Sequence, residues 1–117
     1  MADYGVAVTW GDMKPGREKQ AFEAWAEGAA LNDKAVANGQ IERWDAVMFE
    51  PIGSPPLGAI RLYGTQEQID EFIRSDEFRS TVQQAGMALN AVGYRRFITG
   101  DALLEGLARG SAAIEAL

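Results

Sequence analysis

The amino-acid sequence predicts one α+β domain with elements in the order β-α-β-β-α-β, followed by a C-terminal helix. Three observations support this prediction. The 117 residues, 47% of them hydrophobic, are enough for one compact core and too few for two. Apolar positions alternate between the period of a strand and that of a helix. No repeat or linker divides the chain, so we expect a single domain over 1–117, with a core over 1–100 and a terminal helix over 101–117.

The first strand is expected over residues 4–10, which are rich in valine, threonine and aromatic residues. Successive side chains of a strand point to opposite faces, so the large residues share one face and the small ones the other. The large residues are Tyr4, Val6, Val8 and Trp10, and the small ones are Gly5, Ala7 and Thr9. The small side chains of Gly5, Ala7 and Thr9 leave space above their face of the strand.

A long helix is expected over residues 17–37, between Pro15-Gly16 and the stop signal Asn38-Gly39. Its apolar residues recur every three or four positions and predict one buried stripe. The stripe consists of Phe22, Trp25, Ala26, Ala29 and Val36. Asn32 lies within it. If it is buried, its amide needs a hydrogen-bond partner in the protein, in water or in a ligand; otherwise the helix is rotated enough to expose it.

Two further strands are expected over 41–50 and 57–63, separated by a proline-rich loop over 51–56. Charges near the start of the 41–50 strand favour an edge position. Thr65 and Gln68 then form a capping-box pattern, and Ser75 a second N-cap, which splits the next helix in two. A strand over 92–99 precedes the terminal helix. We expect that helix to dock on the body or on a partner subunit through its apolar side, formed by Leu103, Leu107, Ile114 and Leu117.

This order is that of the split βαβ, ferredoxin-like arrangement, in which helices cover one face of a four-stranded antiparallel sheet. The uncovered face is expected to carry the large residues of the first strand. Such an apolar patch is unfavourable in water. We therefore predict a homodimer whose sheets pack face to face through Tyr4, Val6, Val8 and Trp10.

The chain resembles the dimeric α+β barrel superfamily, and within it the antibiotic-biosynthesis-monooxygenase-like group. The resemblance covers most of residues 4–99 and rests on two features. One is Pro15-Gly16 before an aromatic-bearing helix; the other is the segment 63–78, where a strand leads into a short capped helix and a Ser-x-x-Phe break. The superfamily includes cofactor-independent oxygenases, haem-degrading enzymes and lactone isomerases, so the resemblance implies a fold more than an activity.

The resemblance also implies where a ligand would lie. The positions that match the Asn, Trp and His of the haem-degrading branch are Thr9, Phe72 and Val82, and none keeps its functional type. Haem degradation is therefore not expected. The Thr9 face would look toward the helices and border the ligand pocket, and the Tyr4 face would fill the barrel between subunits.

The amino-acid composition limits which cofactors, catalytic groups and partners are expected. The chain has no histidine and no cysteine, so we expect no haem, flavin or transition-metal cofactor and no Ser-His-Asp or cysteine chemistry. A net charge of −6 argues against nucleic acid and anionic membranes as partners. The first residues lack a basic and apolar leader, and no apolar run is long enough to span a membrane, so the expected location is the cytoplasm.

No residue can be assigned a catalytic role from the sequence. The candidate pocket residues are Thr9, Trp25, Asn32, Arg61, Tyr63, Phe72 and Val82. Trp25 and Tyr63 are also explained by core or rim packing. Arg61, and whichever of Arg95 and Arg96 faces inward, would either form an ion pair with an acid such as Asp45 or bind a carboxylate ligand.

Three functions remain open at this level. The first is a homodimer that binds a small apolar or aromatic molecule. The second is a cofactor-independent monooxygenase or isomerase that acts on an aromatic or polyketide-like substrate. The third is a protein-interaction module that uses the terminal helix. A pocket with several unpaired polar groups would favour the enzyme, and a filled core would favour the interaction module.

Overall fold

Four strands form one antiparallel sheet in the order β2-β3-β1-β4, within a computed structural model that describes residues 3–50 and 56–117. The predicted loop over 51–56 lies outside the described residues except for Pro56. The strands are β1 (Tyr4–Trp10), β2 (Arg43–Met48), β3 (Gly58–Gly64) and β4 (Gly93–Ile98). The predicted edge position of the second strand is confirmed.

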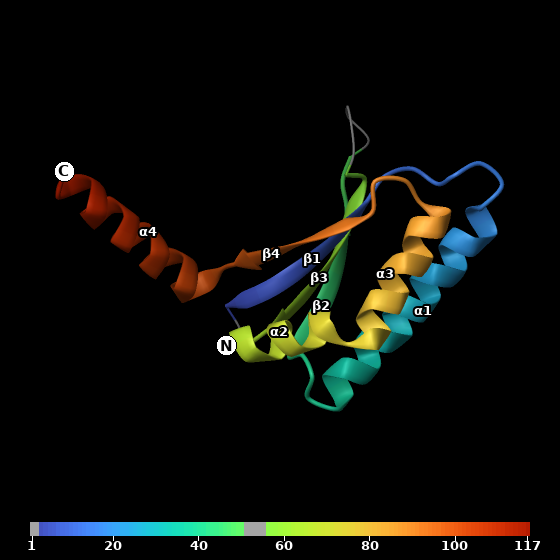
Figure 1. Cartoon of the computed structure of the whole chain (residues 1–117), viewed down its shortest axis with the longest axis horizontal. Coiled ribbons are helices and arrows are strands. Elements are labelled where there is room, and N and C mark those ends of the chain that lie inside the picture. Colours follow the sequence, from blue (N-terminus) through green and yellow to red (C-terminus); the bar gives the residue numbers. More distant parts are fainter. Residues whose placement is uncertain (1–2, 51–55) are drawn as a thin grey trace.

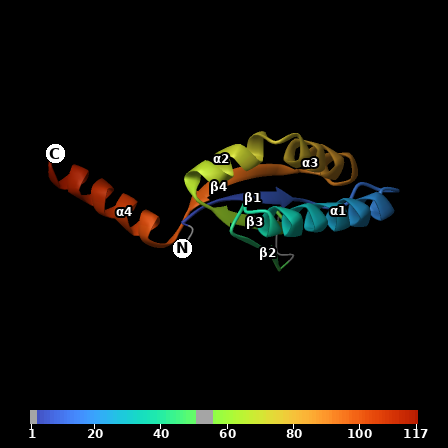
Figure 2. The same cartoon turned by 90° about the horizontal axis from the view of Figure 1, so that it is seen from below.

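Three helices cover one face of this sheet, and a fourth projects from its end (Figure 1). They are α1 (Glu18–Ala37), α2 (Gln66–Arg74), α3 (Asp76–Ala88) and α4 (Gly100–Glu115). The element order, the split second helix and the extra C-terminal helix confirm the predicted ferredoxin-like α+β fold. Figure 2 shows α1, α2 and α3 beside the sheet and α4 extending clear of it.

Local capping signals set the break between α2 and α3. The Thr65 hydroxyl accepts a hydrogen bond from the Gln68 backbone N–H at 3.1 Å, and the Gln68 side-chain oxygen accepts one from the Thr65 N–H at 2.8 Å. The Ser75 hydroxyl accepts from the Phe78 N–H at 3.2 Å and starts α3. The chain therefore turns between the two helices where the sequence predicts.

The prediction for the two faces of β1 is wrong. Val6 is completely buried, and it packs in the core with Leu62 of β3, Phe72 of α2 and Phe78 of α3. Tyr4, Val6, Val8 and Trp10 therefore face the helices, and Gly5, Ala7 and Thr9 lie on the open face. The physical reason is that the helices need large apolar side chains beneath them to exclude water.

The buried stripe of α1 is displaced from the predicted one by about one position. The buried residues are Ala21, Gly28, Asn32 and Ala35, whereas Phe22 is 67% exposed. A Cβ on Gly28 would lie 3.4 Å from the Thr81 methyl group of α3. The small residues therefore let α1 approach α3 closely, and the larger apolar residues border this contact.

Of the two predicted docking sites for the terminal helix, the body of its own chain is excluded, because no residue of α4 is buried. Leu107 is 62% exposed and Ile114 is 71% exposed. Docking on a partner subunit stays a prediction. Within the described ranges, no helix is both long enough and apolar enough to cross a membrane.

Candidate functional site

A cavity of about 560 Å³ lies between the sheet and the helices α1 and α3. β1 contributes Val8 and Trp10, and β3 contributes Ile60 and Leu62. The walls from α3 include Val82 and Leu89. This volume lies in the range of small-molecule sites, and the walls are mostly apolar, as is usual for such sites.

Asn32 is the polar residue of α1 that lines this cavity. It is only 5% exposed, although its neighbours on the same side of α1 are alanine and glycine. Its amide takes part in none of the side-chain hydrogen bonds found among the described residues. No fully buried side-chain nitrogen or oxygen there lacks a partner. The Asn32 amide therefore borders the open space of the cavity, where a hydrogen-bonding ligand group or water would satisfy it.

Aromatic and methionine side chains form the rim of the cavity. Trp10 and Trp25 meet edge to face with ring centroids 6.2 Å apart. Four lining residues are strongly exposed: Met13 (42%), Phe22 (67%), Trp25 (42%) and Met48 (72%). The cavity thus opens to the surface through a rim whose apolar side chains stay exposed among residues 3–50 and 56–117.

Four of the predicted pocket residues line the cavity: Thr9, Trp25, Asn32 and Val82. Thr9 does so at the end of β1, between Val8 and Trp10, although it belongs to the open face of that strand. Phe72 does not. It is 2% exposed and packs edge to face on Phe78 at 5.6 Å, as part of the core beside the cavity. Arg61 and Tyr63 do not line it either, because they share the open face of the sheet with Gly5 and Ala7. The predicted position between sheet and helices contains a cavity, but its floor is the Val8 face of β1 and not the Ala7 face.

Arg61 belongs to a polar cluster on the open face. Its Nε and Nη2 atoms donate to the two carboxylate oxygens of Asp45 at 2.8 and 3.0 Å. The Tyr63 hydroxyl donates to the same carboxylate at 3.5 Å, and the Arg43 guanidinium lies 3.6 Å from the centre of the Tyr63 ring. The ion-pair interpretation of Arg61 is therefore confirmed, and Asp45 is its partner.

This pairing shifts both ionisable groups toward their charged forms. The hydrogen bond from Arg61 lowers the pKa of the Asp45 carboxyl, and partial burial opposes that effect. The hydrogen bond to Asp45 raises the pKa of the Arg61 guanidinium. Both residues are charged near neutral pH and occupied with each other, so Arg61 is not a free anchor for a ligand carboxylate.

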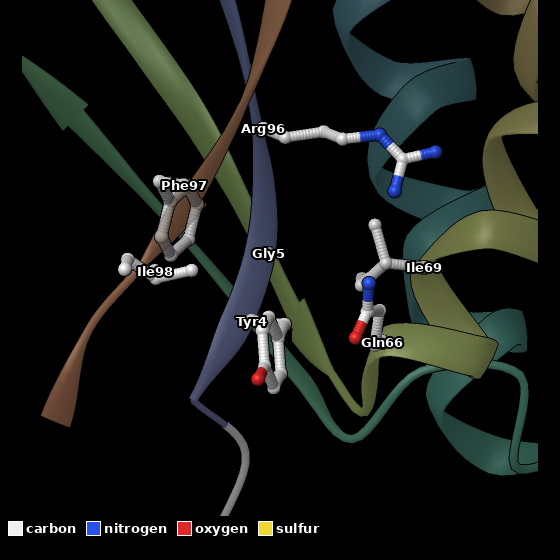
Figure 3. Close-up of a pocket in the computed structure, with 7 residues that line it drawn as sticks. All are labelled: Tyr4, Gly5, Gln66, Ile69, Arg96, Phe97 and Ile98. Atoms are coloured by element: carbon white, nitrogen blue, oxygen red, sulfur yellow. The ribbon is translucent and has the colours of Figure 1, made fainter. Parts of the chain in front are cut away.

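The neighbouring arginines of β4 point to opposite faces. Arg96 lies on the helix side and forms an ion pair with Asp70 of α2, a partner that the sequence does not indicate. Arg95 lies on the open face, where it pairs in register with Ala7. Beside Arg96 is a smaller cleft of about 290 Å³, lined by residues of β1, β4 and α2 (Figure 3). Because its arginine is already paired, this cleft is a weaker candidate than the larger cavity.

Several cavity residues are not identified by the sequence reasoning. They include Met13, Met48 and Leu57, which lie outside the helices and come together with α1 and α3 only in the folded structure. Ala21 and Gly28 are also missed, although small residues at helical spacing on α1 are a signal of close helix packing. Within 3–50 and 56–117, no three acidic side chains lie close enough together to hold a metal ion.

No protein-family model and no curated protein sequence matches this chain. Solved structures do resemble it in fold. A hydroxynitrile lyase from Passiflora edulis is 12% identical with a TM-score of 0.65, over 86% of this chain and 97% of that chain. A candidate antibiotic biosynthesis monooxygenase from Caulobacter crescentus CB15 is 15% identical with a TM-score of 0.61, over 86% and 92% of the two chains.

A dimeric protein of unknown function and ferredoxin-like fold from Bacteroides fragilis is 4% identical with a TM-score of 0.55, over 81% of this chain and 95% of that chain. At such identities these likenesses concern the fold alone. They confirm the resemblance to ferredoxin-like dimeric proteins and to antibiotic-biosynthesis-monooxygenase-like proteins. In the lyase and monooxygenase comparisons, the share of this chain left without a counterpart is about as long as the 16 residues of α4.

Proposed function

We infer that this protein binds a small, mostly apolar molecule in the cavity between its sheet and α1 and α3. The observation that carries the proposal is Asn32, an amide that is 5% exposed and borders an apolar cavity of about 560 Å³. The amide borders the open space of the cavity, so its hydrogen-bonding atoms are accessible to a ligand there. A ligand with one polar group would satisfy the amide and fill the apolar space around it.

The walls favour a planar ligand with one hydrogen-bonding group. The Trp10 and Trp25 rings offer apolar surface near the rim, and Val8, Ile60 and Val82 provide it deeper in the cavity. Asn32 both donates and accepts hydrogen bonds, so it suits a carbonyl or a hydroxyl group. Arg61 belongs to the other face of the sheet, so a carboxylate has no cationic partner from that residue.

We also propose that two copies associate through the open face of the sheet. No helix of the described chain covers that face, where Ala59 and Tyr63 lie beside the Arg61–Asp45 pair. The similar protein from Bacteroides fragilis is dimeric. Sedimentation at micromolar concentration should therefore give the mass of two chains, and a folded monomer would refute the dimer.

Ligand binding can be tested by filling the cavity. Nile red, a neutral planar dye that fluoresces in apolar surroundings, should bind the native protein, and Val82→Trp should weaken its binding by at least ~10-fold by occupying the cavity. Glu27→Trp adds the same side chain to an exposed position of α1 and should leave binding unchanged. Equal dye binding by Val82→Trp and the native protein would refute the proposal.

A second candidate function is a cofactor-independent monooxygenase or isomerase acting on an aromatic or polyketide-like substrate. It is favoured by the fold similarity to the Caulobacter protein and by an amide placed among aromatic side chains. An oxygenase would consume oxygen when a bound phenolic compound is added, and Asn32→Leu would reduce that rate. If such a compound binds with no oxygen uptake and no chemical change, the enzymatic function is refuted and ligand binding is the function that remains.

A further inference from the structure

One of the residues that line the cavity carries a charge. Among residues 3–50 and 56–117, Asp12 is the single charged residue of the lining, and the uncharged polar ones are Thr9, Asn32 and Thr81. Residues 51–55, which the structure does not describe, have no charged side chain in the sequence. Asp12 is exposed and lies just beyond the end of β1. The charge that the lining presents to a ligand is therefore that of one carboxylate.

Contacts with the turn between α3 and β4 hold Asp12 in place. The Asn90 N–H donates to the Asp12 carbonyl oxygen at 2.9 Å, and the Asn90 Nδ2 donates to the Asp12 Oδ1 at 3.2 Å. Figure 1 shows the segment after β1 passing beside this turn. The Asp12 Oδ2 atom takes part in none of the side-chain hydrogen bonds found within the described ranges. This oxygen can therefore accept a hydrogen bond from a ligand, while Asn90 limits the movement of the carboxylate.

The basic side chains that follow Asp12 in the sequence do not line the cavity. The Lys14 Nζ donates to the Gly86 carbonyl oxygen of α3 at 2.8 Å, and the Arg17 guanidinium donates to the Gln20 side chain at 2.9 Å. In the part of the chain that the structure describes, Asp12 forms no ion pair. Residues 12–23 are neutral as a whole, so any preference for a cation depends on the position of Asp12 in the lining and not on the charge of the segment.

Aromatic rings in the same lining provide a second attraction for a cation. Trp10 lies two residues before Asp12 and meets Trp25 edge to face, with ring centroids 6.2 Å apart. Trp25 is 42% exposed, so a ligand can reach its ring from solvent. The face of an aromatic ring attracts a cation, and tryptophan does so most strongly. Indole rings and a carboxylate in one lining suit an ammonium group, which donates hydrogen bonds and carries the opposite charge.

We propose that the ligand of this cavity is a cationic amphiphile, an amine with an apolar body. Its ammonium group would lie at the surface beside the Asp12 carboxylate and the tryptophan rings, and its apolar body would extend into the cavity toward Asn32. A carboxylate or phosphate in the same place would meet Asp12 with a like charge and bind less well. This inference rests on the binding function proposed above and specifies the charge of the ligand.

Three naphthalene compounds that differ in their terminal group test the charge preference on the native protein. They are naphthylmethylamine, naphthylmethanol and naphthylacetate, which are cationic, neutral and anionic at neutral pH. In equilibrium dialysis at low ionic strength, the amine should bind at least ~5-fold more tightly than the alcohol, and the acetate more weakly than both. Added salt should reduce the advantage of the amine, because it screens the attraction to an exposed carboxylate. Equal or weaker binding of the amine would overturn the inference.

A charge-removing variant tests whether Asp12 is responsible. Asp12→Asn keeps a side-chain oxygen that can accept the hydrogen bond from Asn90, and it should bring the advantage of the amine below ~2-fold while the alcohol binds as before. Glu27→Gln removes a negative charge from an exposed position of α1 outside the lining and should keep the advantage. An equal loss in both variants would overturn the assignment to Asp12. The comparison on the native protein decides the charge preference even if Asp12→Asn does not fold.

The same titrations separate this inference from the proposed function. If the native protein binds the alcohol and Nile red but does not favour the amine, the binding function stands and the charge preference fails. If the native protein binds none of the three compounds and no Nile red, the proposed binding function itself fails.

Discussion

The two faces of the sheet are built from the same four strands but serve different purposes. The side facing the helices carries Val6, Leu62 and Ile60, which pack the core and border the cavity. The open side carries the Arg61–Asp45 pair and Tyr63. Because strand side chains alternate, β3 contributes Ile60 and Leu62 to the helix side and Arg61 and Tyr63 to the open side.

This difference means that each face should respond to substitution in its own way. On the helix side, stability comes from apolar burial and close packing, so loss of volume is costly. On the open side, the charged groups are partly exposed and solvent weakens their interactions. Apart from Gly5, where backbone and ring approach closely, the open face should tolerate change better.

The largest effect is expected for Phe72→Ala on the helix side. Phe72 is 2% exposed and packs on Phe78, so its truncation should lower the free energy of unfolding by about 3–5 kcal/mol. The matched variant on the open face is Phe97→Ala, whose ring is only partly buried. Denaturant unfolding of both variants tests the comparison, and an equal or larger loss for Phe97→Ala would contradict it.

Gly5→Ala should give the next largest loss, because Gly5 is where the open face is most tightly packed. A Cβ there would collide with the Phe97 ring and with the Leu62 carbonyl oxygen, which belongs to backbone and cannot move freely. We expect a loss of about 1–3 kcal/mol in thermal or denaturant unfolding. Gly93→Ala on β4 is the control, because nothing lies within 4 Å of its Cβ position. A neutral Gly5→Ala would show that the ring moves aside.

The order of the elements was predictable because it depends on local signals. Thr65 with Gln68, and Ser75 before Phe78, cap helices through neighbours three residues away, so the sequence specifies these breaks. Strand and helix periods likewise depend on adjacent residues. The fold class therefore follows from patterns that need no knowledge of distant contacts.

The orientation of those elements was not predictable in the same way. Alternation separates Val6 from Ala7, but only the helices that cover the sheet decide which face is buried. On α1, Phe22 and Val36 are as apolar as a core requires, yet the close approach to α3 selects Ala21 and Gly28 instead. Of the site, Asn32 and Trp25 were found because the helical spacing of apolar residues predicts the side of α1 that faces the sheet. The sequence left the face of Arg61 open, and only the strand register places it on the open face.

Asn32→Leu should have a smaller effect, and in the opposite direction. The Asn32 amide is buried and lacks a partner among the side-chain hydrogen bonds of the described residues, so leucine should keep stability or raise it by about 1 kcal/mol. Binding of Nile red, which carries a carbonyl group, should weaken because the amide is lost. A stability loss above about 2 kcal/mol would instead mark Asn32 as a structural hydrogen-bonding residue.

The smallest effect is expected from acid titration of the open face. The Arg61 hydrogen bond lowers the pKa of Asp45 below its ordinary value of 3.8, so the folded state binds the proton less readily than the unfolded state. The stability from this pair is present above that ordinary value and is lost as the pH falls through the lowered pKa. Asp45→Asn should therefore lower the melting temperature slightly at pH 7 and flatten its decline below about pH 4. The control is Glu71→Gln, on an exposed position of α2, which should show the same decline of the melting temperature below about pH 4 as the native protein.

If Asp45→Asn shows that same decline, the exposed Arg61–Asp45 pair contributes nothing measurable to folding, as solvent screening allows.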